Sequence, residues 1–234
     1  MKKNKKILFL DILTADKRLR QRVEKDFGAP YSEESRRALG LSKIQFISVD
    51  ASKGEFPDLK DYDGVIISGS AEDPVRGQEK QWMKQAYRFI LEIIKAKKPL
   101  LGICGGLQFT VRALGGKIVY NPRGRNFGTT LITLTAAGQK DNLFKGLPRI
   151  TKVQSNHSCI ISKLKRGWKV LAFSEMTPFE TVALGSKVRL VQFHPERSLE
   201  NMQVVAKPSE FKRLSDAIRT GKKIMQNFLN YFVR

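Results

Sequence analysis

The stretch Pro99-Leu100-Leu101-Gly102-Ile103-Cys104-Gly105-Gly106-Leu107-Gln108 decides how the rest of the chain is interpreted. An apolar run enters it and a helix-compatible segment leaves it, which predicts a buried strand, a sharp turn that carries the thiol of Cys104, and a helix. Gly102, Gly105 and Gly106 supply the room that such a turn needs. Because the free N–H groups and the dipole at a helix start stabilise negative charge, the pattern indicates that Cys104 is a nucleophile with thiolate character.

Two other interpretations of this stretch stay open on the local motif alone. A cysteine beside a glycine-rich turn can be a buried structural thiol. A glycine-rich turn can also cradle phosphate, but this one lacks the Gly-Lys-Ser/Thr ending of a P-loop and the spacing of the dinucleotide fingerprint. The phosphate interpretation is therefore the weaker of the two.

Strand-like and helix-like segments alternate through the first half of the chain. Apolar strands are predicted at 6–10, 44–49 and 63–68, and helices at 16–27, 31–40, 79–96 and 107–114. This alternation predicts an α/β protein with a doubly wound parallel sheet, in which ligands bind beyond the carboxyl ends of the strands. Residues 68–70 and Cys104 follow two such strands.

The second half of the chain has a different pattern, because short strand-like runs replace the alternation of strands and helices. These runs lie at 129–135, 150–154, 168–174, 181–184 and 188–193. They predict hairpins and edge strands added to the sheet, and a closing amphipathic helix is predicted at 210–232. With 234 residues and a hydrophobic fraction of 41%, the chain is expected to form one domain that spans 1–234.

The chain is strongly basic, with 43 lysine and arginine residues against 22 acidic ones and a formal net charge of +21. Such a field attracts nucleic acid, acidic proteins or anionic membranes. The basic residues are spread along the whole chain without aromatic interleaving, which favours a solvated surface over a specific nucleic-acid site. No apolar run approaches the ~20 residues that span a bilayer, and two cysteines are too few for a disulfide framework. A cytoplasmic location is therefore expected.

A thiol nucleophile needs a base, and the chain contains two histidines, His157 and His194. His194 closes an apolar strand and is followed by Pro195 and Glu196. In an extended segment residues two apart point the same way, so Glu196 is expected beside the imidazole, where it would fix the tautomer and support the cation. Cys104, His194 and Glu196 are the candidate catalytic residues.

The two motifs around these residues, Gly102-Ile103-Cys104-Gly105-Gly106-Leu107-Gln108 and Gln192-Phe193-His194-Pro195-Glu196, together resemble those of the class I glutamine amidotransferase family. Residues 63–70, Gly115-Gly116 and Ser155-Asn156-His157 resemble further parts of the family in the same order. The resemblance implies a mostly parallel, flavodoxin-like sheet with an added antiparallel portion, and an enzyme that needs no cofactor.

Carried over to this chain, the resemblance implies that Cys104 attacks the side-chain amide carbon of glutamine. It implies that His194 protonates the leaving ammonia and that a γ-glutamyl thioester is then hydrolysed. It assigns the oxyanion hole to the backbone N–H groups of Ser70 and Gly105, where one lost donor typically costs about 10²–10³ in rate. Substrate contacts are implied for Gly69, Gln108, Asn156 and His157.

The chain departs from the family pattern at three places. Ser70 stands where many members have a second glycine, which narrows the backbone conformations open to the oxyanion loop. Gly105 has no side chain where bulkier residues are frequent, which predicts a wider pocket. Asn126 stands where the family often has glutamate, and the substrate contacts there are left open.

For three further features the structural interpretation is favoured. His157 is expected to be a loop histidine with backbone hydrogen bonds rather than a second base, because one base suffices. Cys159 is expected to be a packed core thiol. Two histidines and two dispersed cysteines form no ligand cluster, so no metal site is expected.

The expected function is the release of ammonia from glutamine. One alternative is a γ-glutamyl peptide hydrolase with the same triad, which Gly105 and the lack of a fused synthase domain in this sequence favour. The other is a basic binding module that keeps the fold without catalysis. Because ammonia would be lost without a second active site, an acidic synthase partner is expected to dock against residues 68–77 and stimulate a slow glutaminase.

Overall fold

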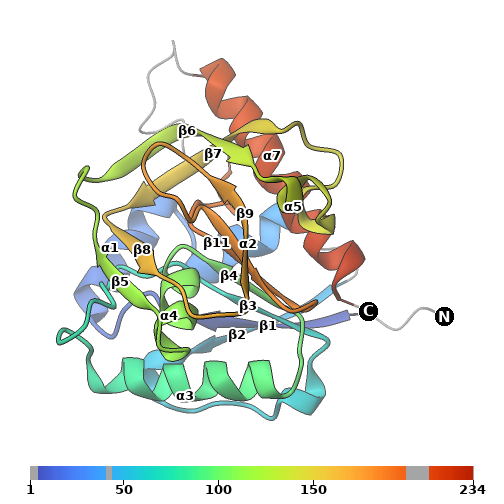
Figure 1. Ribbon diagram of the computed structural model, residues 1–234. Helices are drawn as coiled ribbons and strands as arrows, with labels where there is room; N and C mark the ends of the chain where they lie inside the picture. The colour runs from blue at the N-terminus through green and yellow to red at the C-terminus, as the bar shows by residue number, and fades with distance from the viewer. Residues whose placement is uncertain (1–4, 41–43, 199–210, 234) are drawn as a thin grey trace.

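A nine-stranded mixed sheet forms the centre of the computed structural model, which describes residues 5–40, 44–198 and 211–233 (Figure 1). Its strands follow the order β2-β1-β3-β4-β11-β10-β9-β6-β7. They are β1 (Lys5–Asp11), β2 (Ile44–Asp50), β3 (Gly64–Ile67), β4 (Leu100–Ile103), β6 (Asn126–Leu134), β7 (Ile150–His157), β9 (Trp168–Phe173), β10 (Thr181–Leu184) and β11 (Val188–Val191).

The sheet has a parallel half and an antiparallel half, which confirms the expected fold class. Strands β2, β1, β3, β4 and β11 pair in parallel, whereas β10, β9, β6 and β7 continue from β11 in antiparallel pairs. No strand was predicted for β5 (Lys117–Tyr120) or β8 (Cys159–Lys163), which form a separate two-stranded sheet. Both strands are short and come from distant parts of the chain, so the pairing has no local signature.

Helices cover both faces of the sheet. They are α1 (Lys17–Phe27), α2 (Tyr31–Ala38), α3 (Gln81–Lys95), α4 (Gly105–Ala113), α5 (Ala136–Gln139) and α7 (Phe211–Tyr231), with short 3₁₀ turns η1 (Ala51–Lys53), η2 (Leu59–Asp61) and η3 (Asn142–Phe144). Alternate residues of β1 belong to two different cores. Ile7 and Phe9 pack in the core that includes α7, whereas Leu8 and Leu10 pack in the core that includes α3 and α4.

Helix α4 begins at Gly105, two residues before the predicted start at 107. Cys104 is therefore the N-cap residue, directly between strand β4 and the helix. The first backbone N–H groups of a helix have no partner within the helix, so the thiol lies next to free donors. The predicted strand–turn–helix is thus tighter than the apolar pattern alone indicated.

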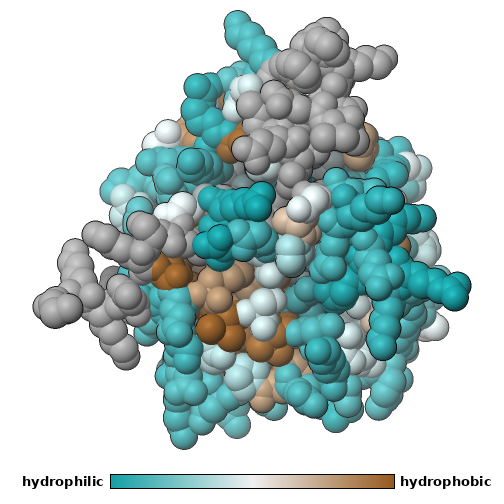
Figure 2. All heavy atoms as spheres, turned by 180° about the vertical axis from the view of Figure 1, so that it is seen from behind, coloured by the Kyte–Doolittle hydropathy of each residue, from teal (hydrophilic) through white to brown (hydrophobic). Residues whose placement is uncertain are grey.

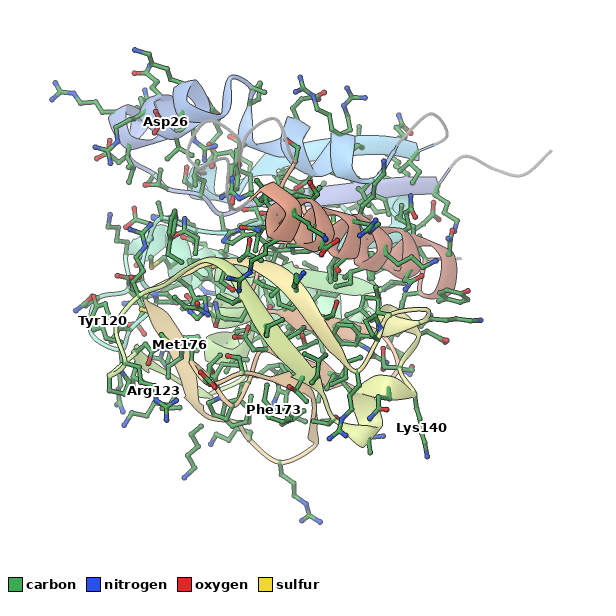
Figure 3. All side chains as sticks on the ribbon, turned by 90° about the horizontal axis from the view of Figure 1, so that it is seen from above. Asp26, Tyr120, Arg123, Lys140, Phe173 and Met176 are labelled. Carbon is green, nitrogen blue, oxygen red and sulfur yellow. The ribbon has the colours of Figure 1, made fainter. Side chains whose placement is uncertain are left out.

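The surface is rich in basic side chains. Arg123 and Lys140 are exposed and extend outward from the antiparallel side of the molecule (Figure 3). The face opposite to Figure 1 is mainly hydrophilic, with a small group of hydrophobic residues near its centre (Figure 2). Among the described residues, no helix combines the length and the apolar composition that crossing a membrane requires.

Candidate active site

Cys104 occupies a strained turn at the carboxyl end of β4. Its φ of 48° and ψ of −98° are unusual for a residue with a side chain, and such conformations cost about 1–3 kcal/mol. Two backbone hydrogen bonds hold the turn: Cys104 N–H donates to Val191 O at 2.8 Å, and Gln108 N–H donates to Cys104 O at 3.1 Å. The strain falls on the residue whose thiol was identified as the candidate nucleophile.

His194 and Glu196 form a buried pair that faces the same site. His194 Nδ1 lies 2.7 Å from Glu196 Oε1, and the two side chains are 5% and 3% exposed. The backbone N–H of His194 donates to Gln154 O of β7 at 2.7 Å, which anchors the residue to the antiparallel half. Burial alone lowers the pKa of His194, but the charges of Glu196 and Cys104 outweigh burial and raise this pKa above its ordinary value. The imidazole is therefore able to remain protonated near neutral pH.

The thiol of Cys104 has two further polar neighbours, Gln192 and Asn156. Gln192 Nε2 and the carbonyl oxygen of Asn156 each lie 3.8 Å from the sulfur. Gln192 is fully buried, and the sequence interpretation gave it no role. Val191 pairs with Ile103 in the parallel register of β11 and β4, so the next residues, Gln192 and Cys104, leave the strands side by side. That register is a property of the folded sheet and was not readable from the motif.

The two proposed oxyanion donors are neighbours. A Cβ added to Gly105 would lie 2.5 Å from both Ser70 N and Ser70 Cβ. The absent side chain at position 105 therefore does not by itself widen the pocket, because residues 69 and 70 fill the space that such a side chain would take. Glycine at this position allows residues 69 and 70 to approach the start of α4.

Gly69 allows a second close approach at the same loop. A Cβ on Gly69 would lie 2.5 Å from the hydroxyl of Tyr31 and 3.1 Å from His194 Cε1. Tyr31 comes from α2 and lines the cavity, but nothing in its sequence surroundings distinguished it from a core residue. Gly69 therefore has a packing role, which is to let the loop approach Tyr31 and His194, in addition to the substrate contact expected for it.

A cavity of about 410 Å³ connects the candidate residues. Its lining includes Ser70, Cys104, Gln108, Asn156, His157 and His194. Gln108 is 4% exposed, and its Nε2 donates to Cys159 O at 3.0 Å, so its amide also holds the start of β8. The cavity brings Gln108, Asn156 and His157, which were predicted for substrate binding, together with Cys104 and His194, whereas Gly69 and Glu196 lie behind its lining.

His157 uses both ring nitrogens within the protein. Its Nδ1 lies 3.1 Å from Cys159 O, and its Nε2 lies 3.3 Å from Asn126 Nδ2. Burial lowers the pKa of His157 to about 4, so the ring is neutral at neutral pH. Nδ1 then carries the proton and Nε2 accepts from Asn126. This geometry fits a structural role, and it explains the asparagine at position 126 as the partner of His157.

Helix α7 supports the candidate triad from behind, at a residue that sequence interpretation did not single out. A Cβ on Gly221 would lie 2.5 Å from Pro195 O and 2.9 Å from Pro195 Cα. Pro195 joins His194 to Glu196, so the packing of α7 against Pro195 helps to position both side chains. Glycine within a helix costs about 0.5–1 kcal/mol relative to alanine, and the close contact accounts for its presence here.

Gly221→Ala is therefore expected to destabilise the protein, opposite to the usual effect of this exchange in a helix. We expect the free energy of unfolding in urea to fall by about 1–3 kcal/mol. The catalytic rate should fall as well, because Pro195 must move. Lys222→Ala, at an exposed neighbouring position, is the control and should change neither quantity. A gain of stability in Gly221→Ala would contradict this packing argument.

A family model described as glutamine amidotransferase class-I matches residues 23–207, and the chain belongs to this family. Gamma-glutamyl peptidase 4 of Arabidopsis thaliana is 29% identical over 195 residues, which cover 81% of this chain and 73% of that protein. The glutamine-hydrolysing GMP synthase of Staphylococcus carnosus is 31% identical over 215 residues. These residues cover 88% of this chain but 38% of the synthase.

A solved structure supports the same fold. A glutamine amidotransferase from Thermotoga maritima superposes with a TM-score of 0.72 at 19% sequence identity, and the match covers 99% of each chain. At this identity the likeness concerns the fold. The relatives therefore include both a hydrolase of γ-glutamyl peptides and an enzyme that hydrolyses glutamine, and the choice between these activities rests on the site.

Proposed function

We propose that this protein is a cysteine-dependent hydrolase of γ-glutamyl amides, with glutamine as the default substrate. The observation that carries the proposal is the convergence of the strained Cys104 turn and the buried His194–Glu196 pair on one cavity. A nucleophile, a base and an orienting carboxylate are the parts that covalent acyl transfer needs. Membership of the amidotransferase family supports the γ-glutamyl group as the acyl portion.

In the first half of the reaction, the sulfur of Cys104 attacks the γ-carbonyl carbon of the substrate. The carbonyl oxygen becomes an oxyanion, which the backbone N–H groups of Ser70 and Gly105 stabilise. The C–N bond then breaks, and His194 gives its proton to the leaving nitrogen, so that ammonia departs from glutamine. The raised pKa of His194 supports this role, because the ring still holds a proton near neutral pH.

In the second half, water attacks the γ-glutamyl thioester. His194, now neutral, takes a proton from the water, and a second oxyanion forms in the same hole. The C–S bond breaks, glutamate leaves, and the sulfur of Cys104 is ready for the next substrate. Glu196 stays ionised throughout, because its pairing with His194 outweighs the effect of burial and lowers its pKa.

A γ-glutamyl peptide is the second candidate substrate, and the cavity favours it through size and charge. A volume of about 410 Å³ is within the range of pockets that hold ligands larger than one amino acid. Among the described residues, Arg22, Arg125 and Arg197 line the cavity together with one acidic residue, Asp73. Glutamine brings one carboxylate, whereas a γ-glutamyl peptide adds a second one that an arginine would bind.

Glutamate release from glutamine and from γ-glutamyl dipeptides separates the two substrates. If the peptide is the substrate, Arg22→Ala should raise KM for the dipeptide by about tenfold and leave glutamine hydrolysis nearly unchanged. Arg123→Ala is the matched control, since this exposed arginine does not line the cavity. If the unmodified chain hydrolyses neither compound, the proposed function fails. Salt-dependent binding of DNA or RNA that persists in Cys104→Ala would then favour the basic binding module.

An acidic synthase is proposed as the acceptor of ammonia if glutamine is the substrate. The net charge of +21 would attract such a partner. The comparison with the GMP synthase supports the idea, because that protein is much longer than the region that matches this chain. Free γ-glutamyl peptides would need no acceptor, since hydrolysis completes the reaction.

A further inference from the structure

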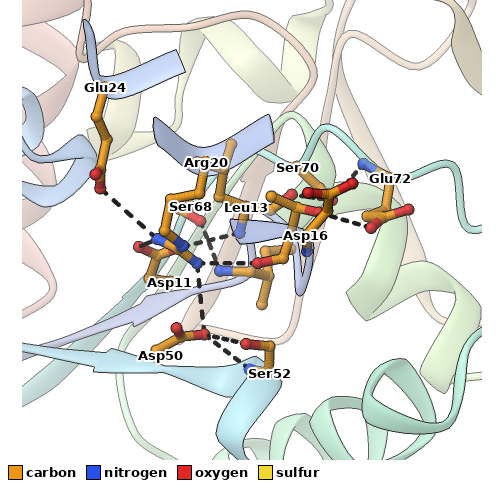
Figure 4. A network of polar contacts seen from close by, with 12 residues as sticks. Asp11, Leu13, Asp16, Arg20, Glu24, Asp50, Ser52, Ser68, Ser70 and Glu72 are labelled. Atoms are coloured by element: carbon orange, nitrogen blue, oxygen red, sulfur yellow. Dashed lines mark hydrogen bonds and ion pairs between the residues drawn. The ribbon is translucent and has the colours of Figure 1, made fainter. Parts of the chain in front are cut away.

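The oxyanion loop is bonded to the turn that follows β1. Ile12 N–H donates to Ser68 Oγ at 2.9 Å, and Ala71 N–H donates to Leu13 O at 2.9 Å. The hydroxyl of Ser70 lies 3.3 Å from the same Leu13 carbonyl and accepts from the Glu72 N–H at 3.0 Å (Figure 4). Both ends of the loop are therefore tied to one neighbouring segment.

The hydroxyl of Ser68 also holds the peptide that carries the oxyanion donor. Ser68 Oγ donates to Gly69 O at 2.8 Å while it accepts from Ile12 N–H. Gly69 O belongs to the same peptide group as the N–H of Ser70. Because C=O and N–H point in opposite directions in a trans peptide, a bond to this carbonyl fixes the direction of the Ser70 N–H. A flip of this peptide would break the bond between Ser68 Oγ and Gly69 O, and both groups would lose a hydrogen-bond partner.

An ion pair between Arg20 and Asp11 stabilises the turn to which the loop is bonded. Arg20 Nη1 lies 2.6 Å from Asp11 Oδ2, and Arg20 Nη2 donates to Thr14 O at 3.2 Å. Asp11 Oδ1 accepts from Leu13 N–H at 2.8 Å. The two charged side chains are 19% and 7% exposed, so solvent screens the pair little. The pair fixes the turn that offers Ile12 N–H and Leu13 O to the oxyanion loop.

We propose that Ser68 is a positioning residue that latches the 69–70 peptide with the Ser70 N–H turned toward the oxyanion. The proposal rests on the proposed function, because it concerns the same hole. The Ser68 hydroxyl then holds the oxyanion hole in its active conformation in the isolated chain. The Arg20–Asp11 ion pair supports this conformation. The hydroxyl of Ser70 adds two more bonds that hold the loop. The loop then needs no docking partner to become ordered.

The test uses Ser68→Ala, which removes the hydroxyl and leaves the backbone unchanged. A freed peptide should lower kcat for γ-glutamyl hydrolysis by about tenfold, up to the 10²–10³ of a fully lost donor, with little change in KM. The γ-aldehyde analogue of glutamine forms a tetrahedral adduct with the thiol, and its affinity should fall by a similar factor. Alkylation of Cys104 by iodoacetamide forms no oxyanion and should stay within twofold.

Ser162→Ala is the control, because the Ser162 hydroxyl also donates to a backbone carbonyl, that of Lys117, but lies in the sheet of β5 and β8 and not in this network. It should leave all three measurements unchanged. If Ser68→Ala keeps its kcat and its affinity for the aldehyde while Ser162→Ala behaves as expected, the latch is refuted. An equal fall in alkylation would also refute it, since the damage would then be general. If the unmodified chain hydrolyses no γ-glutamyl compound, the proposed function fails, and the aldehyde measurement still decides the latch.

Discussion

Replacement of Cys104 by serine is expected to lower kcat/KM for γ-glutamyl substrates by at least about 10⁴-fold. A serine hydroxyl has nearly the same shape as the thiol but is far less acidic, so the nucleophile would be lost while the strained turn is kept. Binding of the substrate should change little, because the cavity around position 104 stays intact. Steady-state glutamate release and substrate binding by calorimetry measure the two effects separately.

Cys159→Ser is the matched control for this experiment. Cys159 is as buried as Cys104, and its sulfur donates to Asp73 Oδ1 at 3.3 Å. Burial and the charge of Asp73 raise the pKa of the Cys159 thiol above its ordinary value, so it stays protonated and unreactive. We expect Cys159→Ser to keep its activity within about fivefold. Comparable losses in both variants would contradict the assignment of Cys104 as the nucleophile.

Glu196→Gln is expected to lower kcat by about 10²–10⁴-fold, the range found when the orienting carboxylate of a triad is neutralised. The amide would keep the volume of Glu196 but remove the charge that stabilises the His194 imidazolium. Its NH₂ group would also favour the wrong tautomer of the ring. Stopped-flow measurement of glutamate release gives kcat for both proteins.

The same exchange should move the pH profile. His194 must hold a proton to release the leaving group, so kcat is retained below the pKa of His194 and is lost as the pH rises through it. Glu196 helps to raise that pKa, and its removal should shift the alkaline limb of kcat to lower pH. Glu175→Gln removes an equal charge from an exposed position and should leave the limb in place. An unshifted limb in Glu196→Gln would show that this pair does not control the proton.

The parallel half of the fold was predictable from the sequence for a physical reason. Strands β3 and β4 are buried on both faces, so every residue in them is apolar or glycine, and helix α3 between them shows a clear 3.6-residue period. The sheet of β5 and β8 was missed because its strands are short and partly exposed, so neither has a regular apolar pattern. Its formation depends on a pairing between distant segments.

Some residues of the candidate site were likewise predictable from the sequence, and others were not. Cys104, His194 and Glu196 were predictable because they lie in two short motifs and because the chain has so few histidines. Ser68 was visible as part of the loop after β3, but its bond to the Gly69 carbonyl exists only in the folded loop. Gly221 was read as part of an amphipathic helix, and its contact with Pro195 depends on how that helix crosses the sheet.

The central claim is that Cys104 carries the γ-glutamyl group during turnover. The most direct measurement is rapid acid quenching of the protein during hydrolysis of a γ-glutamyl substrate, followed by peptide mapping with mass spectrometry. The account predicts one γ-glutamyl group on the peptide that contains Cys104, and hydroxylamine should remove it as it removes a thioester. The Cys104→Ser variant should carry no such group. A γ-glutamyl group on Cys159, or turnover by Cys104→Ser at the unmodified rate, would contradict it.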